Sequence, residues 1–408
     1  EVIAQFGPFS QTANPASLCD WENGRYKPTP TIIEAAKAMY AKHSIEEISR
    51  SEAGAQNLSV TNDYVQQIIA YAKAKGEKTI CFVTGVPGSG KTLAGLNIAT
   101  QAMEASDNKT GAVFLSGNGP LVAVLQEALA RDRVAQATIE NSSLRIGDAR
   151  SETRTFIQII HRWRDDYLED ETSPEERVVV FDEAQRAWTV EQTSIFMKTK
   201  KNLPDFNKSE PEFLLEVMER HVGWCVVICL VGGGQEINKG EAGIDEWLRA
   251  ASNSKENWAI HVSDKLSARD TFGEAPKLSS DSSLTPALHL ATSIRSFRAE
   301  ALSDFVAAML EGNIEAAREL RRGLKDYPIA VTRDLAVARH WVKSRARGTE
   351  QYGLVASSNA LRLKPIGLFP KADIDPVKWF LNGKQDVRSC YALEDVATEF
   401  EVQGLELD

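Results

Sequence analysis

The sequence predicts an α/β protein built on parallel sheets, and three observations support this. A short apolar run, TICFVT at 79–84, precedes several glycines and then a stretch of helical periodicity from Lys91 to about Glu104. The order of strand, glycine-rich loop and helix opens an α/β nucleotide-binding unit. Because near-continuous apolar strands separated by helices are buried on both faces, the later runs indicate a parallel sheet. These runs are AVFLS (112–116), VVVFD (178–182), WCVVICLVG (224–232) and WAIHV (258–262), with helical segments such as 119–131 and 211–221 between them.

Composition excludes several classes of protein. Of the 408 residues, 43% are hydrophobic and 25% charged, the balance of a soluble globular protein with two or three domains. We find no apolar run of about 18 residues and no signal peptide, and so expect no membrane partner. The net charge of −10 argues against a nucleic-acid coat protein and leaves room only for a local basic groove. An odd number of scattered cysteines indicates a reducing, cytoplasmic location: Cys19, Cys81, Cys225, Cys229 and Cys390.

Residues 1–75 are expected to form an irregular and helical lead-in. Residues 1–30 are rich in Pro, Gly, Asn and Ser around a tryptophan, which is typical of irregular chain. A helix is predicted to begin near Thr31, because Thr31 and Glu34 have the spacing of a capping box. A second helix is predicted at 61–75.

After the lead-in, the patterns divide the chain into a first lobe at 76–265, a linker with helices at 266–325 and a second lobe at 326–408. The segment 263–286 is rich in Ser, Asp and Pro, so we expect a loop that ends the first core. The second lobe repeats the α/β pattern, with strands predicted at 328–331, 352–358 and near 388–392 and a helix at 334–346.

The segment GVPGSGKT, from Gly85 to Thr92, fits the phosphate-loop motif G-x-x-x-x-G-K-[ST] in its required context between a strand and a helix. Glycines let backbone N–H groups converge on phosphates, and the helix N-terminus adds partial positive charge. Lys91 is predicted to reach the β- and γ-phosphates of ATP, and the Thr92 hydroxyl to ligate Mg²⁺. The alternative is a glycine-rich turn without a ligand. The predicted nucleotide-binding residues of this loop are Gly85, Pro87, Gly88, Ser89, Gly90, Lys91, Thr92 and Leu93.

The apolar run at 178–182 ends in two acids, Asp182 and Glu183. An aspartate at the tip of a buried strand beside a phosphate loop can hold Mg²⁺ through water, and the adjacent glutamate can orient or deprotonate the attacking water. Two acids after an apolar run also describe a strand that runs out into solvent. Together with the phosphate loop, however, they predict a site that hydrolyses Mg-ATP.

From the sequence DEAQ at 182–185 onward, the residues resemble the ordered motifs of superfamily 1 helicases. VGGGQ (231–235) resembles motif III, and the resemblance implies that Gln235 senses the γ-phosphate. SIRS (293–296) resembles motif IV, which implies that Arg295 contacts the γ-phosphate.

Three further segments extend the resemblance. QGLEL (403–407) resembles motif V, which implies that Gly404 and Glu406 contact the nucleotide. FLSGNGPL (114–121) looks like motif Ia and TFIQIIHRW (155–163) like motif Ib, which in the superfamily help to hold single-stranded nucleic acid.

More narrowly, the chain from about Trp21 to Asp408 resembles the Schlafen group-3-like DNA/RNA helicase domain family. The segments that carry this resemblance are PTPTIIEAAKAMY, ICFVTGVPGSGKTLAGLNIA, FLSGNGPLV, FDEAQRAW, LVGGGQEI, IRSFRAEALSDFV and EFEVQGLELD. The resemblance implies two RecA-like P-loop lobes with parallel sheets, an ATP-dependent helicase or translocase, Mg²⁺ as cofactor and single-stranded DNA or RNA as partner.

The sequence departs from the superfamily pattern in two places. Motif III lacks its usual acid, since Gly232, Gly233 and Gly234 precede the glutamine. The superfamily also places an arginine in a motif VI after motif V, whereas this sequence stops at Asp408. We therefore expect an incomplete second lobe and a piece of a longer polypeptide, with a nuclease-like region elsewhere in that polypeptide or in a partner subunit.

Two other functions remain open at this point. An AAA+-type ATPase that remodels proteins shares the phosphate loop and the Asp-Glu strand, but it predicts a helical lid in place of a second α/β pattern. A nucleotide-gated sensor would bind nucleic acid and hydrolyse ATP slowly without unwinding, which suits the altered motif III.

Several other residues have both a structural and a functional interpretation. Cys225 and Cys229 lie on one apolar run without a partner pair, which favours buried structural thiols over a metal site. Trp163 and Trp188 favour packing over base stacking. The basic cluster at 339–347 is either a solvated helix face or a nucleic-acid contact.

Overall fold

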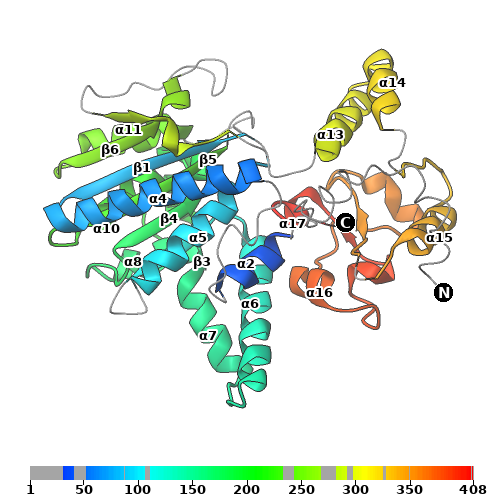
Figure 1. Ribbon diagram of the computed structural model, residues 1–408, viewed down its shortest axis with the longest axis horizontal. Helices are drawn as coiled ribbons and strands as arrows, with labels where there is room; N and C mark the ends of the chain where they lie inside the picture. The colour runs from blue at the N-terminus through cyan, green and yellow to red at the C-terminus, as the bar shows by residue number, and fades with distance from the viewer. Residues whose placement is uncertain are drawn as a thin grey trace, which may run out of the picture.

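The computed structural model describes residues 31–40, 52–86, 88–105, 111–232, 243–267, 282–291, 297–324, 328–348, 350–405 and 407. A large α/β unit and a smaller C-terminal unit lie side by side in Figure 1. None of the described helices has the length and apolar character needed to cross a membrane.

The large unit contains an eight-stranded sheet in the order β3-β2-β4-β5-β1-β6-β7, with β8 also paired to β1. Every strand pair is parallel. This confirms the predicted parallel α/β fold, and the short β3 within the motif Ib segment adds an edge strand that the sequence pattern did not predict. The strands are β1 (Lys78–Gly85), β2 (Ala112–Ser116), β3 (Ile157–Ile159), β4 (Val178–Asp182), β5 (Cys225–Gly232), β6 (Trp258–Ser263), β7 (Ser283–Thr285) and β8 (His289–Leu290).

Helices cover both faces of this sheet. Successive apolar side chains of each central strand point to opposite faces, so both faces must be buried. On β1, Cys81 and Val83 join the core under one set of helices, whereas Ile80 and Phe82 join the core on the other face. The first face carries α4 (Glu52–Lys75), α5 (Lys91–Glu104) and α6 (Gly119–Ile139), and the second carries α8 (Ile160–Glu169), α10 (Glu210–Glu219) and α11 (Gly243–Asn253). Two further helices are α7 (Ile146–Phe156) and α9 (Val190–Lys200).

The lead-in helices follow the sequence with one difference. The capping box that begins α2 (Ile32–Tyr40) is confirmed, since the Thr31 backbone N–H donates to the Glu34 carboxylate (3.0 Å) and the Glu34 N–H donates to the Thr31 hydroxyl (3.3 Å). The second helix, α4, begins at Glu52 and is longer than the predicted 61–75. Its polar first half is held by tertiary contacts, such as the amide of Asn57 donating to the carbonyl of His289 (3.2 Å), which helical periodicity does not reveal.

The segment 263–286, predicted to be a loop, ends in regular structure. Residues 283–285 form β7, a 3₁₀ turn η4 (Pro286–Leu288) follows, and β8 then pairs with β1. Leu288 and Leu290 are buried in the core of the large unit. The sheet therefore includes strands beyond residue 265, where the first lobe was predicted to end.

The C-terminal unit contains helices and a small parallel sheet of two strands, β9 (Leu354–Val355) and β10 (Val396–Ala397). The helix predicted at 334–346 is confirmed as α15 (Leu335–Arg345). The strand predicted at 328–331 is wrong, because these residues are irregular and Val331 is exposed. The strand predicted near 388–392 is also wrong, because residues 390–392 form a 3₁₀ turn and the strand follows it. The other elements are α13 (Phe297–Leu310), α14 (Ile314–Gly323), α15 (Leu335–Arg345), η5 (Leu361–Ile366), α16 (Pro376–Leu381), η6 (Cys390–Ala392) and α17 (Glu399–Val402).

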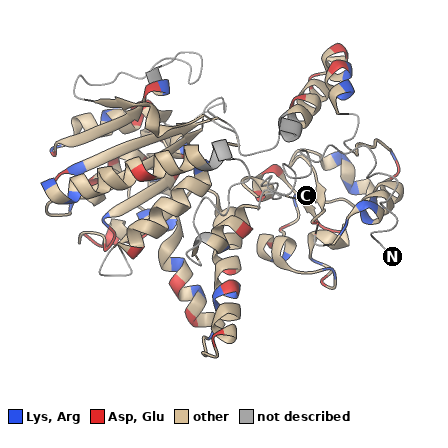
Figure 2. Ribbon diagram, viewed as in Figure 1, with Lys and Arg blue, Asp and Glu red and all other residues tan. Residues whose placement is uncertain are grey.

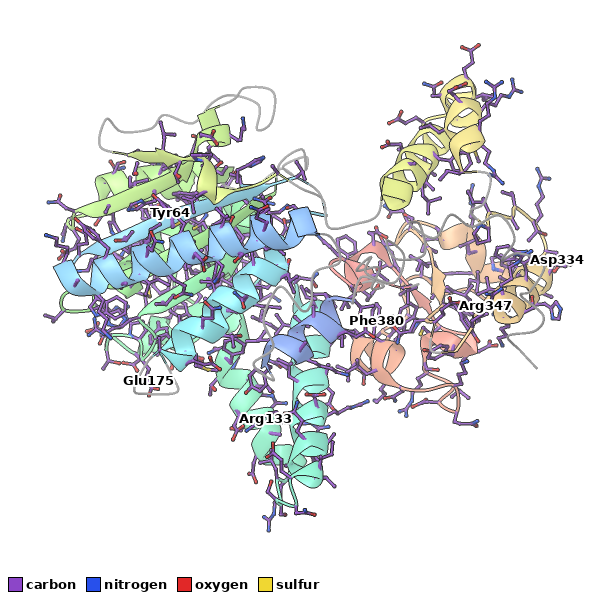
Figure 3. The ribbon with its side chains drawn as sticks, viewed as in Figure 1. Tyr64, Arg133, Glu175, Asp334, Arg347 and Phe380 are labelled. Carbon is purple, nitrogen blue, oxygen red and sulfur yellow. The ribbon has the colours of Figure 1, made fainter. Side chains whose placement is uncertain are left out.

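The two units meet along α6. Helix α16 buries Trp379 and Phe380 in the same core as apolar side chains of α2 and α6, and Figure 3 labels Phe380 at this junction. Arg131 of α6 donates to the carbonyl oxygen of Leu381 (3.2 Å) and to the side chain of Asn382 (3.3 Å). The C-terminal unit is thus docked on the helix that begins at the motif Ia segment.

Candidate functional site

The phosphate loop joins the end of β1 to the start of α5 at the carboxyl edge of the sheet. Gly90 is the N-cap of α5 and has φ 82°, a left-handed conformation that glycine adopts without a Cβ penalty. The N-terminus of α5 therefore lies at the end of the loop, where its backbone N–H groups and the helix dipole favour binding of an anion.

Gly85 is required by close packing against β8. A Cβ at Gly85 would lie 2.4 Å from the Ser89 hydroxyl oxygen and 2.8 Å from the Cβ of Leu290. The Val86 N–H donates to the Leu290 carbonyl at 3.2 Å, so β8 holds the first half of the loop. The Ser89 hydroxyl is buried and has no hydrogen-bond partner among the described residues. Because buried polar atoms are normally hydrogen-bonded, this is consistent with a loop that binds a polar ligand.

Lys91 lies against its own loop. Its ammonium group donates to the carbonyl oxygens of Gly85 (3.0 Å) and Val86 (3.3 Å). A lysine ammonium carries three N–H donors and a positive charge, which suit phosphate oxygens. This geometry fits the predicted contact of Lys91 with the β- and γ-phosphates.

The two predicted metal ligands lie together. The Thr92 hydroxyl donates to both carboxylate oxygens of Asp182, at 3.3 Å each. Among the described residues, no cluster of three or more His, Cys, Asp and Glu side chains could hold a metal ion. A hydroxyl and one carboxylate that leave other positions to phosphate and water match the way Mg²⁺ binds at nucleotide sites.

The surroundings of Asp182 disfavour its ionised carboxylate. Burial, and secondly the neighbouring charge of Glu183, raise its pKa to about 7, although the Thr92 hydrogen bond and Lys91 act in the opposite direction. A buried carboxylate in this state gains most from a cation placed beside it. The residues present therefore fit a divalent cation.

Glu183 follows β4 in a left-handed conformation, with φ 54°, which is uncommon for a residue other than glycine. Its carboxylate accepts a hydrogen bond from the Gln185 amide at 2.5 Å. The same Gln185 side chain accepts from the Gly232 N–H (3.3 Å), and the Trp247 indole donates to the Ala184 carbonyl (2.8 Å). The turn from Glu183 to Gln185 is thus held from two sides.

Sequence reasoning missed the supporting roles of Gln185, Trp247 and His289. The Thr84 hydroxyl lies 2.9 Å from Nδ1 of His289, immediately before the phosphate loop, and burial lowers the pKa of His289. Only Gln185 left a signal in the sequence, because it belongs to the DEAQ segment that carries the helicase resemblance. The other two contacts join residues that are far apart in the chain.

Two more predicted site residues lie on the loop and on the helix that follows it. Leu93 is buried within α5, and Gly88 has φ 75° within the loop. Four predicted residues lie outside the part of the chain that the structure describes, and their roles stay predictions. They are Pro87, Gln235, Arg295 and Glu406.

Gly404 lies against the N-terminus of α6. Its φ is 76°, and a Cβ there would lie 3.2 Å from a methyl carbon of Leu121. Asn118 caps α6 by accepting from the Leu121 N–H (3.2 Å) and donates to the Gln403 carbonyl (2.6 Å). The motif V segment is therefore fixed to the motif Ia segment, whereas its contact with nucleotide stays a prediction.

The motif Ib segment borders a polar hollow of about 370 Å³. Two arginines face it, Arg154 from α7 and Arg162 from α8, and both side chains are exposed. Figure 2 shows both signs of charge scattered over the helices, and the lining of the hollow contains one acid, Asp166, besides its two arginines. The lining residues are Gly147, Ser151, Arg154, Thr155, Gln158, Arg162 and Asp166.

The structure bears on the other interpretations that the sequence left open. Cys225 and Cys229 are buried in β5, which supports the structural interpretation, and burial raises the pKa of the Cys225 thiol to about 12. Trp163 is fully buried, so its packing role is confirmed. Helix α15 buries none of its residues, and the Arg345 guanidinium lies over the Trp341 ring at 4.9 Å, so a nucleic-acid contact at this helix stays a prediction.

Comparison with known proteins gives two findings and one absence. No curated protein matches the chain. The solved structure of the Pyrococcus furiosus Hef helicase domain is similar to it with a TM-score of 0.28 and 14% sequence identity, over 85% of this chain and 88% of that one. The family model described as Schlafen group 3, DNA/RNA helicase domain, matches residues 78–408, most of the sequence. The chain therefore belongs to the Schlafen group 3 DNA/RNA helicase domain family.

Proposed function

We propose that this protein is an ATP-dependent DNA/RNA helicase or single-strand translocase that hydrolyses Mg-ATP at the Gly85–Thr92 loop. The observation that carries the proposal is the contact between Thr92 and Asp182 at 3.3 Å beside Lys91. Residues 90 positions apart meet in the arrangement that Mg-nucleotide chemistry requires. Family membership supports the nucleic-acid part of the proposal.

The residues around the phosphate loop and the tip of β4 have distinct proposed roles. Thr92 and Asp182 hold Mg²⁺, which when bound neutralises charge on the phosphates. Lys91 binds the β- and γ-phosphates. Glu183 orients the attacking water and accepts its proton, because its carboxylate lies at the tip of β4 and is held by Gln185. The αL backbone of Glu183 fixes the direction in which this carboxylate leaves the strand.

The remaining roles rest on the resemblance to superfamily 1 motifs. Gln235 and Arg295 are proposed to sense the γ-phosphate, and Gly404 and Glu406 to contact the nucleotide. A second RecA-like lobe, with gain and loss of the γ-phosphate changing its position on the first, is part of the same proposal. The docking of Gly404 on the cap of α6 supports communication between the motif V and motif Ia segments.

The Arg154 and Arg162 hollow is the proposed contact for the sugar-phosphate backbone. Two exposed guanidinium groups outnumber the single carboxylate, Asp166, among the lining residues, so the hollow suits phosphate oxygens, and such contacts position a strand without reading its bases. A protein with a net charge of −10 needs only a narrow basic track for this purpose.

The test measures ATP hydrolysis with and without single-stranded DNA and RNA, with Lys91→Ala as the inactive control. We expect Mg²⁺-dependent turnover that single strands stimulate and that Lys91→Ala abolishes. A stable hexamer with nucleotide and no response to single strands would favour the AAA+ alternative. Binding of single strands together with slow, unstimulated hydrolysis would favour the nucleotide-gated sensor.

A further inference from the structure

Arg164 of α8 is a fully buried arginine in the large unit, with a side-chain exposure of 0%. Its guanidinium carbon lies 5.2 Å from the centre of the Trp188 ring and 4.7 Å from that of Phe196. Its nitrogens donate to the Glu210 carboxylate (3.1 Å) and to the Asp165 carboxylate (3.0 Å). The charge is therefore held in one position by two aromatic rings and two acids.

Glu210, at the start of α10, is the partner that ties Arg164 to the catalytic turn. Its side-chain exposure is 2%, and its second carboxylate oxygen accepts from the Trp188 backbone N–H at 3.1 Å. The Glu210 N–H in turn donates to the Trp188 carbonyl at 3.0 Å. Glu210 therefore holds Trp188 through both its backbone N–H and its backbone carbonyl.

The contacts between Arg164, Glu210 and Trp188 lie between the residues that follow β4 and the polar hollow. Trp188 follows closely after the 3₁₀ turn η2 (Ala184–Arg186), which directly follows Glu183. On the other side, α8 places Arg162 and Asp166 on the wall of the polar hollow, one on each side of Arg164 in the sequence. The backbone of α8, the Arg164–Glu210 and Glu210–Trp188 contacts and the chain between Trp188 and η2 together connect the hollow to the residues at the tip of β4.

Stability alone does not account for such a pair. Because burying two charges costs several kcal/mol of desolvation, a well-packed apolar pair of similar size is often at least as stable. In contrast, the planar Arg164 guanidinium fixes the relative position of three segments through directional hydrogen bonds and ring contacts. These are α8 itself, the segment that contains Trp188 and Phe196, and the start of α10. The geometry is that of a positioning device.

We propose that Arg164 and Glu210 are positioning residues that couple occupancy of the Arg154 and Arg162 hollow by single-stranded nucleic acid to the Glu183–Gln185 turn. A strand that pulls on Arg162 moves α8, and the Arg164–Glu210–Trp188 contacts pass that movement to the turn that holds Glu183. This inference rests on the proposed function, because it requires hydrolysis that nucleic acid stimulates.

The test uses the full chain and three variants of the pair. Arg164→Lys keeps the charge but loses the planar fork, and Glu210→Gln keeps only one of the two carboxylate acceptors. The double variant Arg164→Met/Glu210→Met removes both charges together, so that it folds even where a single buried charge does not. The matched control is Glu219→Gln, the same substitution at the other end of α10, where the carboxylate accepts from the Trp258 indole at 2.8 Å.

For each variant the basal turnover, the turnover saturated with single strands, the KM for ATP and the Kd for the strand are measured. We expect the ratio of stimulated to basal turnover to fall roughly 2- to 30-fold in the three variants, with KM and Kd unchanged, since couplings carried by such networks are of this size. Glu219→Gln keeps the full ratio even where its melting temperature falls.

The outcomes separate this inference from the proposed function. If the unmodified protein shows no stimulation, the proposed function fails and the coupling fails with it. If the unmodified protein is stimulated and the three variants keep the same ratio, the coupling alone is overturned. An equal loss of basal and stimulated turnover, or a weaker Kd, also overturns it, because either result assigns the pair to catalysis or to binding.

Discussion

The Gln185 side-chain amide donates a hydrogen bond to the Glu183 carboxylate at 2.5 Å, across a turn in which Glu183 adopts φ 54°. The same side chain accepts from the Gly232 N–H at the end of β5. One glutamine therefore joins the proposed catalytic base to the strand that leads into the motif III segment. A shift of β5 would therefore change the position of the Glu183 carboxylate through Gln185.

Replacing this glutamine tests its role. Gln185→Glu keeps an acceptor for Gly232 but places a second negative charge against Glu183. We expect ATP turnover to fall by roughly 10- to 100-fold with little change in ATP affinity, because general acid–base catalysis contributes about 100- to 10,000-fold and a misoriented base loses part of it. Gln185→Met, which removes the hydrogen bonds without adding charge, should fall less. Equal turnover in all three proteins would contradict the assignment.

The raised pKa of Asp182 predicts how stability depends on pH. The ordinary pKa of an aspartate is near 4, and in the folded protein burial and Glu183 raise it to about 7. The folded state therefore holds a proton that the unfolded state has lost, so this group lowers stability progressively as pH rises from about 4 to 7. Asp182→Asn should be more stable than the unmodified protein by a few kcal/mol at pH 8, and the difference should shrink as pH falls and vanish only near pH 4, about the pKa of the unfolded chain.

Thermal unfolding in a chelator, measured from pH 5 to 8, checks this prediction. Hydrolysis by Asp182→Asn should be lost throughout, so that stability and activity change in opposite directions. A constant difference in melting temperature across the pH range would show that Asp182 is ionised in the folded protein at pH 5.

Gly85→Ala tests the close approach of β8 to the phosphate loop. The added Cβ would meet Ser89 at 2.4 Å and Leu290 at 2.8 Å. We expect a loss of about 1–3 kcal/mol in the free energy of unfolding, as for overpacking elsewhere, together with weaker ATP binding. Denaturant unfolding and nucleotide titration measure the two effects. Gly383→Ala, where nothing lies within 4 Å of the added carbon, is the control and should change neither.

Asn118 has two functions that substitution can separate. Asn118→Asp keeps a side-chain oxygen for the Leu121 N–H, but it puts a carboxylate against the Gln403 carbonyl. We expect faster hydrogen exchange in α17 with α6 unaffected. Asn118→Ala should lose the cap as well, at about 1 kcal/mol of helix stability. Unchanged exchange in α17 for both variants would mean that Gly404 and Leu405 hold the segment without Asn118.

The arginine hollow predicts a salt-dependent change in affinity. Arg154→Gln/Arg162→Gln should weaken binding of single strands and lower the slope of log affinity against log salt by about 0.7 for each phosphate that the protein no longer neutralises. Arg249→Gln, which removes an exposed arginine paired with Glu246 on α11, should change neither. An unchanged slope in the double variant would place the strand elsewhere, with α15 as the next candidate.

Much of the large unit could be predicted from the sequence because its signals are local. The apolar run of β1, the glycines after it and the periodicity of α5 lie within one continuous stretch, and the Thr92 to Asp182 contact followed from two recognisable motifs. The C-terminal unit defeated the same reasoning. The apolar residues at 328–331 match the pattern of a strand, but in the structure they are irregular and Val331 is exposed. Pairings such as Thr84 with His289 depend on tertiary packing, which no local pattern encodes.

The position of β8 has a consequence for the order in which this protein becomes competent. The carbonyl that holds Val86 belongs to Leu290, and the carbonyl that holds Asn57 belongs to His289. During synthesis from the N-terminus, the phosphate loop is made early but its supporting strand emerges from the ribosome about two hundred residues later. We therefore expect a nascent chain to acquire ATP binding only after residue 290 has left the exit tunnel, which delays nucleotide capture until the whole sheet can assemble.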